Sequence, residues 1–175
     1  MSRKLLLLRH AEAAPAPMGD FSTAADHARP LTAAGLAAAQ RCGLWLRQQG
    51  LSPDYVVCSP AVRTRQTLEG LLPFLHAPLS APLFCPDIYE APPHALLAQI
   101  QKAPPQARTV LLIGHNPGIS ALARQLDTQA AVLDQGFATG SLAVFKMWGS
   151  TANTPQPNWQ SCDTLSLTLD TFSRP

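Results

Sequence analysis

Charged residues are scarce in this sequence, and they form no long run of one sign. They make up 14% of the 175 residues, whereas about a quarter is usual for a globular protein. The formal net charge is only +2 and no long stretch of lysine and arginine occurs, which argues against a nucleic-acid partner. Because 46% of the residues are hydrophobic, the composition is that of a globular protein with little charge left for a disordered tail.

Paired cysteines and long hydrophobic stretches are also missing. The four cysteines show no Cys-x-x-Cys pair and no metal-ligand spacing, so we expect reduced, partly buried thiols at Cys42, Cys58, Cys85 and Cys162. The leucine run near the start is too short for a signal-peptide core or a membrane span. These observations predict a soluble, cytoplasmic protein with no membrane partner.

Apolar runs alternate with amphipathic segments along the chain. Continuously apolar runs, of the kind buried on both faces of a parallel sheet, predict strands at residues 3–8, 54–59 and 108–115. Cap residues and prolines predict helices at residues 32–49, 61–73, 94–101 and 117–126. The alternation of strands and helices indicates an α/β protein, with one three-layer α/β/α domain over residues 1–175 and a mostly parallel central sheet.

The other stretches are predicted in less detail. Helical spacing within the 32–49 helix predicts a buried stripe made of Leu36, Ala39, Gly43 and Leu46. The alanine- and proline-rich residues 11–30 predict a loop, and the proline-broken stretch 77–93 leaves room for an edge strand at 83–85. The final part of the chain alternates imperfectly, which predicts two strands at 141–148 and 158–169 joined by the polar loop 149–157.

Cationic side chains lie at the ends of three predicted strands. Arg9 and His10 follow the first strand, His115 ends the third, and Arg63 lies in the first turn of the helix after the second. Sites in α/β sheets form beyond the carboxyl ends of the strands. Two guanidinium groups, two imidazoles and two helix N-termini brought together there would bind an oxyanion, and dianionic phosphate suits this set well.

A histidine placed on the phosphorus axis could itself attack and carry the phosphoryl group. Each residue also has a plainer interpretation when it is taken alone. A histidine after a strand is often a hydrogen-bonded structural residue, and an arginine in a first helical turn is usually at the surface. A metal site at His10 and His115 is a further alternative, but no carboxylate or thiolate stands at a convincing ligand spacing. Only the shared position at strand ends favours a functional site.

Five motifs occur in the order found in the histidine phosphatase superfamily: LLRHAEA, RPLTAAG, VVCSPAVRTRQT, IYEAPP and VLLIGHNPG. The chain resembles the small SixA-type branch of phosphohistidine phosphatases, over residues 4–118 and more loosely through FATGSLAVF. The resemblance implies a phosphoglycerate-mutase-like α/β/α fold and hydrolysis through a phosphohistidine intermediate, with no cofactor and no metal. Ala11 departs from the Arg-His-Gly motif of the superfamily, as it commonly does in this branch.

The resemblance implies that His10 is the nucleophile and that Arg9, Arg63 and His115 complete the catalytic, phosphate-binding set. For this chemistry His10 must be neutral, and its other ring nitrogen needs an acceptor such as a backbone carbonyl to fix the tautomer. The two nearby arginines oppose its protonation.

The motifs offer two candidates for the general acid. Glu90 in IYEAPP is the first candidate and Glu12 the second, although a solvated loop carboxylate is an equal alternative for Glu90. Arg29 could add positive charge near the rim of the site, but an ion pair with Asp26 is the favoured role. The loop at residues 11–30 could line the site or be a flexible surface segment.

The expected activity is that of a phosphatase acting on a phosphohistidine protein. A small-molecule phosphomonoesterase of the same superfamily is one alternative, and a non-catalytic phospho-ligand-binding module is another. Binding alone has no need of an in-line nucleophile, which disfavours the last of these. The sequence does not indicate the physiological substrate or the oligomeric state.

Overall fold

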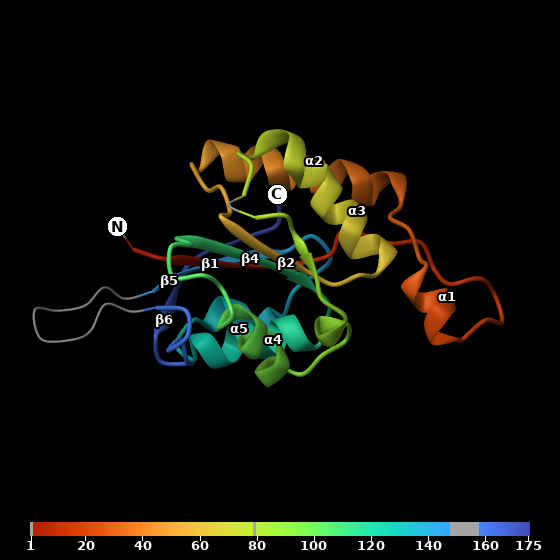
Figure 1. Ribbon diagram of the computed structural model, residues 1–175. Helices are drawn as coiled ribbons and strands as arrows, with labels where there is room; N and C mark the ends of the chain where they lie inside the picture. The colour runs from red at the N-terminus through yellow and green to blue at the C-terminus, as the bar shows by residue number, and fades with distance from the viewer. Residues whose placement is uncertain (1, 79, 148–157) are drawn as a thin grey trace, which may run out of the picture.

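The computed structural model describes residues 2–78, 80–147 and 158–175 (Figure 1). Its centre is a sheet of six strands: β1 (Lys4–Arg9), β2 (Tyr55–Cys58), β3 (Leu83–Phe84), β4 (Thr109–Gly114), β5 (Leu142–Met147) and β6 (Leu167–Ser173). They lie in the order β3-β2-β4-β1-β5-β6. The first four strands are parallel, whereas β5 pairs antiparallel with both β1 and β6.

Helices cover both faces of this sheet (Figure 1). The layer with α2 (Ala33–Gln48) and α3 (Val62–Leu71) lies on one face, and α4 (Pro93–Ile100) and α5 (Gly118–Leu126) lie on the other. Two large hydrophobic clusters, one on each face, form most of the core, and a small third cluster joins Ala11, Leu31 and Ala39. The three-layer α/β/α prediction with a mostly parallel sheet is confirmed.

Strands β1 and β4 are central, and their side chains are shielded on both faces. Leu5 to Leu8 in β1 and Val110 to Gly114 in β4 are consecutive buried residues, which accounts for their unbroken apolar sequence. The two strands pair in register, so that Lys4 lies opposite Thr109 and Arg9 opposite Gly114. Both strands therefore end at the same level of the sheet, and the residues after them meet there.

Helix α2 begins and ends as its sequence predicts. The Thr32 hydroxyl accepts a hydrogen bond from the Gly35 amide at 3.0 Å, and Gly50 follows the helix with a φ of +63°. The predicted buried stripe is right at three positions but wrong at Leu36, which is 44% exposed. Gly35 and Cys42 are buried instead, because the Gly35 side of the helix packs against the backbone of Glu12.

Two other predictions need correction. Residues 11–30 are not only a loop: they contain α1 (Thr23–His27), which begins where the Ser22 hydroxyl accepts from the Ala25 amide at 3.1 Å. The strand predicted at 158–169 is largely wrong, because β6 begins only at Leu167. The Asp163 carboxylate accepts from the Leu165 amide at 2.9 Å and holds the residues just before β6 in a turn. The predicted loop 149–157 lies outside the described residues.

The remaining elements are short 3-10 helices: η1 (Leu72–Phe74), η2 (Pro86–Ile88) and η3 (Ala131–Gln135). The edge strand predicted near residue 83 is present as β3. All four cysteines are buried and free, and burial raises the pKa of Cys42, Cys58 and Cys162 to about 12. No helix in the described ranges is long and apolar enough to cross a membrane.

Candidate functional site

The residues predicted from three strand ends do come together at the carboxyl edge of the sheet. The amide of His10 donates to the Gly114 carbonyl at 3.1 Å, which extends the β1–β4 pairing one residue beyond β1. His10 is therefore held beside His115, with 5.3 Å between their ring centroids. Arg63 reaches the same place from the first turn of α3.

His10 is buried, and its ring is fixed in one tautomer. Its Nδ1 lies 2.7 Å from the Ala11 carbonyl oxygen, which can only accept a hydrogen bond, so Nδ1 carries the proton. Nε2 is left with a free lone pair. Burial, followed by the charges of Arg63 and Arg9, lowers the pKa of His10 to about 4 against the opposing effect of the Ala11 carbonyl. The ring is neutral at pH 7, as the proposed chemistry requires.

The two arginines at the site are anchored by the protein but retain unused donors. Arg9 donates through Nη1 to the Phe137 carbonyl at 2.7 Å. Arg63 is buried and donates to the Asp26 carbonyl at 2.6 Å and to the Asp26 carboxylate at 3.0 Å. In the described part of the chain, the Nε groups of both arginines are buried without a hydrogen-bond partner. Because these Nε groups are closed to solvent, an anionic ligand is favoured instead by the position of two guanidinium cations on the lining of one pocket.

His115 is held between one hydrogen-bond donor, Arg63, and one acceptor, Ser59. Arg63 Nη2 lies 3.2 Å from His115 Nδ1, and because a guanidinium only donates, Nδ1 accepts. The proton is then on Nε2, which donates to the Ser59 hydroxyl at 2.7 Å. Burial and the charge of Arg63 lower the pKa of His115 to about 3. His115 must exchange the Ser59 hydroxyl for a ligand oxygen before its ring N–H can bind phosphate.

Asp26 connects α1 to the site. The predicted Arg29–Asp26 ion pair is present, with 2.9 Å between Nη1 and Oδ1. The same carboxylate also accepts from Arg63 and from the hydroxyl of Tyr89, whose ring lies edge-on to His115. Burial alone would raise the pKa of Asp26, but hydrogen bonds from Tyr89, Arg29 and Arg63 hold it well below its usual range.

Both candidate acids lie at the rim of the site. Glu12 accepts from the Thr32 hydroxyl at 2.8 Å, which ties its carboxylate to the start of α2. Glu90 is exposed and has a φ of 49°, the one positive φ among the described non-glycine residues. Such a backbone conformation costs about 1–3 kcal/mol and is often found at functional sites.

These side chains enclose one pocket of about 210 Å³. Its lining is mostly polar and includes every predicted site residue: Arg9, His10, Glu12, Ala13, Asp26, Arg29, Arg63, Glu90, His115, Asn116 and Thr139. Within the described residues, no three histidine, cysteine, aspartate or glutamate side chains are grouped in a way that could hold a metal ion.

Known proteins resemble this chain in sequence and in fold. The family model for the histidine phosphatase superfamily (branch 1) matches residues 5–81. An uncharacterized protein of Mycobacterium tuberculosis is 36% identical over 137 residues, which are 74% of this chain and 83% of the relative. The structure of a SixA protein from Nakamurella multipartitia superposes with a TM-score of 0.80 and 31% identity, over 100% of this chain and 97% of that one. The chain belongs to the histidine phosphatase superfamily.

This histidine phosphatase is also similar to a relative whose name states an activity. The phosphohistidine phosphatase SixA of Escherichia coli is 29% identical over 125 residues, which are 70% of this chain and 73% of the relative. The chain is therefore a phosphatase of the kind that uses a histidine nucleophile, and its fold is phosphoglycerate-mutase-like as predicted.

Sequence reasoning missed three residues of the phosphatase site. Ser59, Asp26 and Tyr89 hold His115 and Arg63 in place, yet each lies 26 or more residues from its partner in the chain. The one available signal was physical: a buried arginine such as Arg63 needs an acceptor with opposite charge. Nothing in the spacing indicates which carboxylate supplies it.

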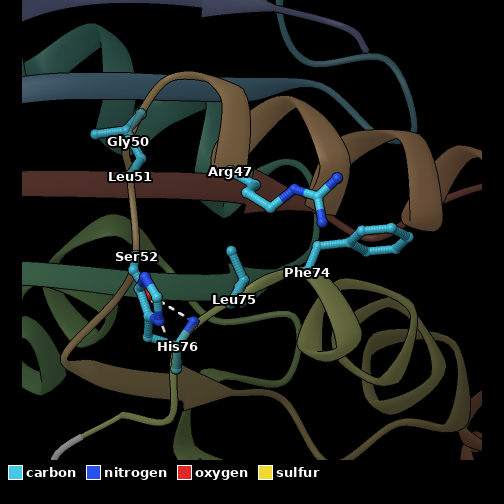
Figure 2. A pocket seen from close by; sticks show the side chains of 7 residues that line it. All are labelled: Arg47, Gly50, Leu51, Ser52, Phe74, Leu75 and His76. Carbon is cyan, nitrogen blue, oxygen red and sulfur yellow. Dashed lines mark hydrogen bonds between the residues drawn. The ribbon is translucent and has the colours of Figure 1, made fainter.

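A second pocket of the phosphatase, of about 80 Å³, lies at the opposite, amino-terminal edge of the sheet (Figure 2). Figure 2 shows Arg47 extending toward Phe74, with its guanidinium carbon 5.6 Å from the ring centroid. The Ser52 hydroxyl accepts from the His76 amide at 3.0 Å. The lining of the second pocket contains one arginine and one histidine, whereas the first pocket has two histidines beside its arginines. The second pocket therefore lacks the phosphate-binding set.

Proposed function

We propose that this phosphatase removes phosphoryl groups from histidine residues of proteins and that His10 is its nucleophile. One observation carries the nucleophile assignment. His10 Nδ1 is bonded to the Ala11 carbonyl, so Nε2 keeps its lone pair in a pocket that it shares with Arg9 and Arg63. A pKa of about 4 keeps the ring neutral and able to attack at pH 7.

In the first step, His10 Nε2 attacks phosphorus in line with the leaving group. A nitrogen–phosphorus bond forms on His10 while the nitrogen–phosphorus bond of the substrate breaks, and the departing imidazole keeps the electron pair. Arg9 and Arg63 bind the equatorial oxygens, over which the transition-state charge is spread. The products are phosphorylated His10 and a free histidine on the substrate.

In the second step, water attacks the phosphorus on His10. An oxygen–phosphorus bond forms while the bond from phosphorus to His10 Nε2 breaks, the electron pair returns to Nε2, and inorganic phosphate is released. Glu90 is the group that we assign to proton transfer at the rim, as an acid toward an ester oxygen in the first step and a base toward water in the second. Its positive φ and its place in the pocket lining support this role. Glu12 is the second candidate. It is less suited to the role because its carboxylate already accepts a hydrogen bond from the Thr32 hydroxyl.

His115 and Asp26 assist the two steps in different ways. His115 donates a hydrogen bond from Nε2–H to a phosphoryl oxygen once this N–H no longer bonds the Ser59 hydroxyl. Asp26 does not contact phosphate: it is a positioning residue that fixes the guanidinium group of Arg63 through two hydrogen bonds. Both interactions stabilise charge on the phosphoryl group whatever the leaving group is.

The chemistry of the leaving group supports a phosphohistidine substrate. An alkyl ester leaves as an alkoxide-like oxygen that gains from a proton, whereas an imidazole can leave already protonated. Glu90, the acid candidate that has no hydrogen-bond partner among the described residues, is exposed at the rim of the pocket rather than buried in it. An exposed acid suits the leaving group that needs less help from a proton. The name of the Escherichia coli relative points in the same direction.

Two variants test this proposal against two substrates. We expect Glu90→Gln to lower kcat/KM for an alkyl phosphate by about 10²–10⁴-fold, the usual contribution of a positioned acid. The same variant should change kcat/KM for a phosphohistidine protein far less, because kcat/KM reports the first step, in which only the ester needs an acid. Any slowing of the second step, which the two substrates share, should appear in kcat for both. His115→Ala is the matched variant, and it should slow both reactions because charge on the phosphoryl group is common to them.

The wild-type rates decide between substrate classes. Dephosphorylation of the phosphohistidine protein should have the higher kcat/KM. If the alkyl phosphate is the better substrate by a wide margin, the protein is a small-molecule phosphomonoesterase. If Glu90→Gln leaves the alkyl rate unchanged, Glu90 is a loop residue and Glu12 is the next acid to test.

A further inference from the structure

Residues 13–31 form an arm whose two ends are tied together at the edge of the catalytic pocket. Ala13 and Leu31 form an antiparallel bridge, and the Ala14 amide donates to the Pro30 carbonyl at 2.8 Å. Arg29 closes the base further, because its Nε donates to the Ala14 carbonyl at 2.7 Å. The arm is therefore held in place before any substrate binds.

The arm is also joined directly to the phosphate-binding residues. Asp26, in the last turn of α1, accepts from Arg63 and from Tyr89. Figure 1 shows α1 and the loop before it projecting from the body of the protein, at the end of the sheet where β1 leads into this segment. The arm thus extends the surface beyond the pocket, and only a ligand larger than the pocket can contact its tip.

Two large apolar side chains at the tip are open to solvent. Met18 exposes 103% of its reference area and Phe21 exposes 97%. Among the other exposed large hydrophobic residues described, Leu165 reaches 89% and the rest do not exceed 44%. Side chains of this kind, three residues apart on an anchored segment, gain free energy when a partner removes them from water. Because hydrogen bonds already order the base of the arm, its backbone there has less conformational entropy to lose on binding.

We propose that Met18 and Phe21 dock an apolar surface of the protein substrate, next to its phosphorylated histidine. The inference rests on the proposed function, and it assigns to residues 13–31 the recognition of the protein rather than of the phosphoryl group. The partner is a protein and not an anionic membrane, because the tip at residues 15–22 carries Asp20 and no lysine or arginine. Phe21 directly precedes the N-cap of α1, so a surface that covers it lies beside the residues that hold Arg63.

The test compares a protein and a small substrate that share the same bond. The double variant Met18→Ser/Phe21→Ser should lose roughly tenfold or more in kcat/KM for a phosphohistidine protein, mainly through KM. Its kcat/KM for phosphoramidate should equal that of the wild type, because neither side chain lines the pocket. Leu165→Ser is the matched control: this exposed residue lies just before β6, at the amino-terminal edge of the sheet, and should change neither rate.

Four results would overturn the docking site. Equal losses with phosphoramidate would mean that the arm acts on the pocket, and unchanged rates with the protein would mean that the tip is not contacted. A wild-type dimer that dissociates in the double variant, measured by sedimentation, would assign the tip to a second copy of this chain. Failure of the wild type to dephosphorylate any phosphohistidine protein, with activity on phosphoramidate retained, would instead reject the proposed function and the docking site with it.

Discussion

The chemistry of the site depends on which nitrogen of each histidine carries the proton. At His10 the Nδ1–H donates to the Ala11 carbonyl, and at His115 the Arg63 guanidinium donates to Nδ1, which leaves the ring proton on Nε2. The two buried rings therefore adopt opposite tautomers. Both are kept neutral, because burial and nearby arginines disfavour a further positive charge. One ring is prepared to attack and the other to donate.

Nuclear magnetic resonance of ¹⁵N-labelled histidine can test this arrangement. We expect an Nδ1–H tautomer for His10 and an Nε2–H tautomer for His115 at pH 7. On acidification, both should titrate well below the usual value of about 6.5, since the pKa of His10 is lowered to about 4 and that of His115 to about 3. His10→Ala and His115→Ala assign the signals. Ordinary titration of His10 near pH 6.5 would contradict the account of its nucleophilicity.

The same depressed pKa values link folding to pH, which provides an independent check. Below about pH 6.5 the unfolded chain binds protons at both histidines, whereas the folded protein does not until pH 4 or lower. Their contribution to stability is thus complete above pH 6.5 and is lost as the pH falls toward 4. The free energy of unfolding should decrease by up to about 1.4 kcal/mol per pH unit for each histidine. The slope should be smaller in His10→Ala.

At the scale of elements, the paired ends of β1 and β4 and the start of α5 bring the site together. Gly118, the first residue of α5, lies against the loop that carries Glu90. A Cβ built on Gly118 would be 2.1 Å from the Ala91 carbonyl oxygen, far closer than atoms can approach. The absence of a side chain at this position allows the Glu90–Ala91 segment to reach the pocket rim.

Gly118→Ala should therefore displace this segment. We expect the free energy of unfolding to fall by about 1–3 kcal/mol, the usual cost of overpacking, and alkyl phosphatase activity to fall with it because Glu90 moves. Chemical denaturation and kcat/KM measure the two effects. Gly19→Ala is the comparison, since Gly19 has nothing within 4 Å of its Cβ position and only its φ of +83° resists the change. If both variants lose equally little stability, close packing at Gly118 is not a constraint.

For the whole molecule, the sequence predicted what depends on local pattern. Buried strands read as continuous apolar runs, the Thr32 cap and Gly50 bounded α2, and four motif residues converged as expected. The failures have a common physical cause. Leu36 is exposed because Gly35 packs on Glu12, and that choice of helix face depends on tertiary contact.

Hydrogen bonds between residues far apart in the chain could not be predicted from the sequence either. The roles of Asp26 and Ser59 depend on hydrogen bonds to residues 37 and 56 positions away in the chain. The turn after Trp159 replaced a predicted strand, because Trp159 is buried and donates to the Ala107 carbonyl at 2.7 Å while Asp163 accepts locally. Alternation in the sequence could not reveal either interaction.

Trapping the covalent intermediate tests the central claim most directly. Rapid quenching of the wild-type enzyme with labelled phosphohistidine substrate should yield one phosphoryl group on His10, labile to acid and stable to alkali as a phosphoramidate is. His10→Ala should remain folded and bind phosphate, yet carry no label. Equal labelling of His10→Ala, or label recovered on another residue of the wild type, would contradict the assignment of His10 as the nucleophile.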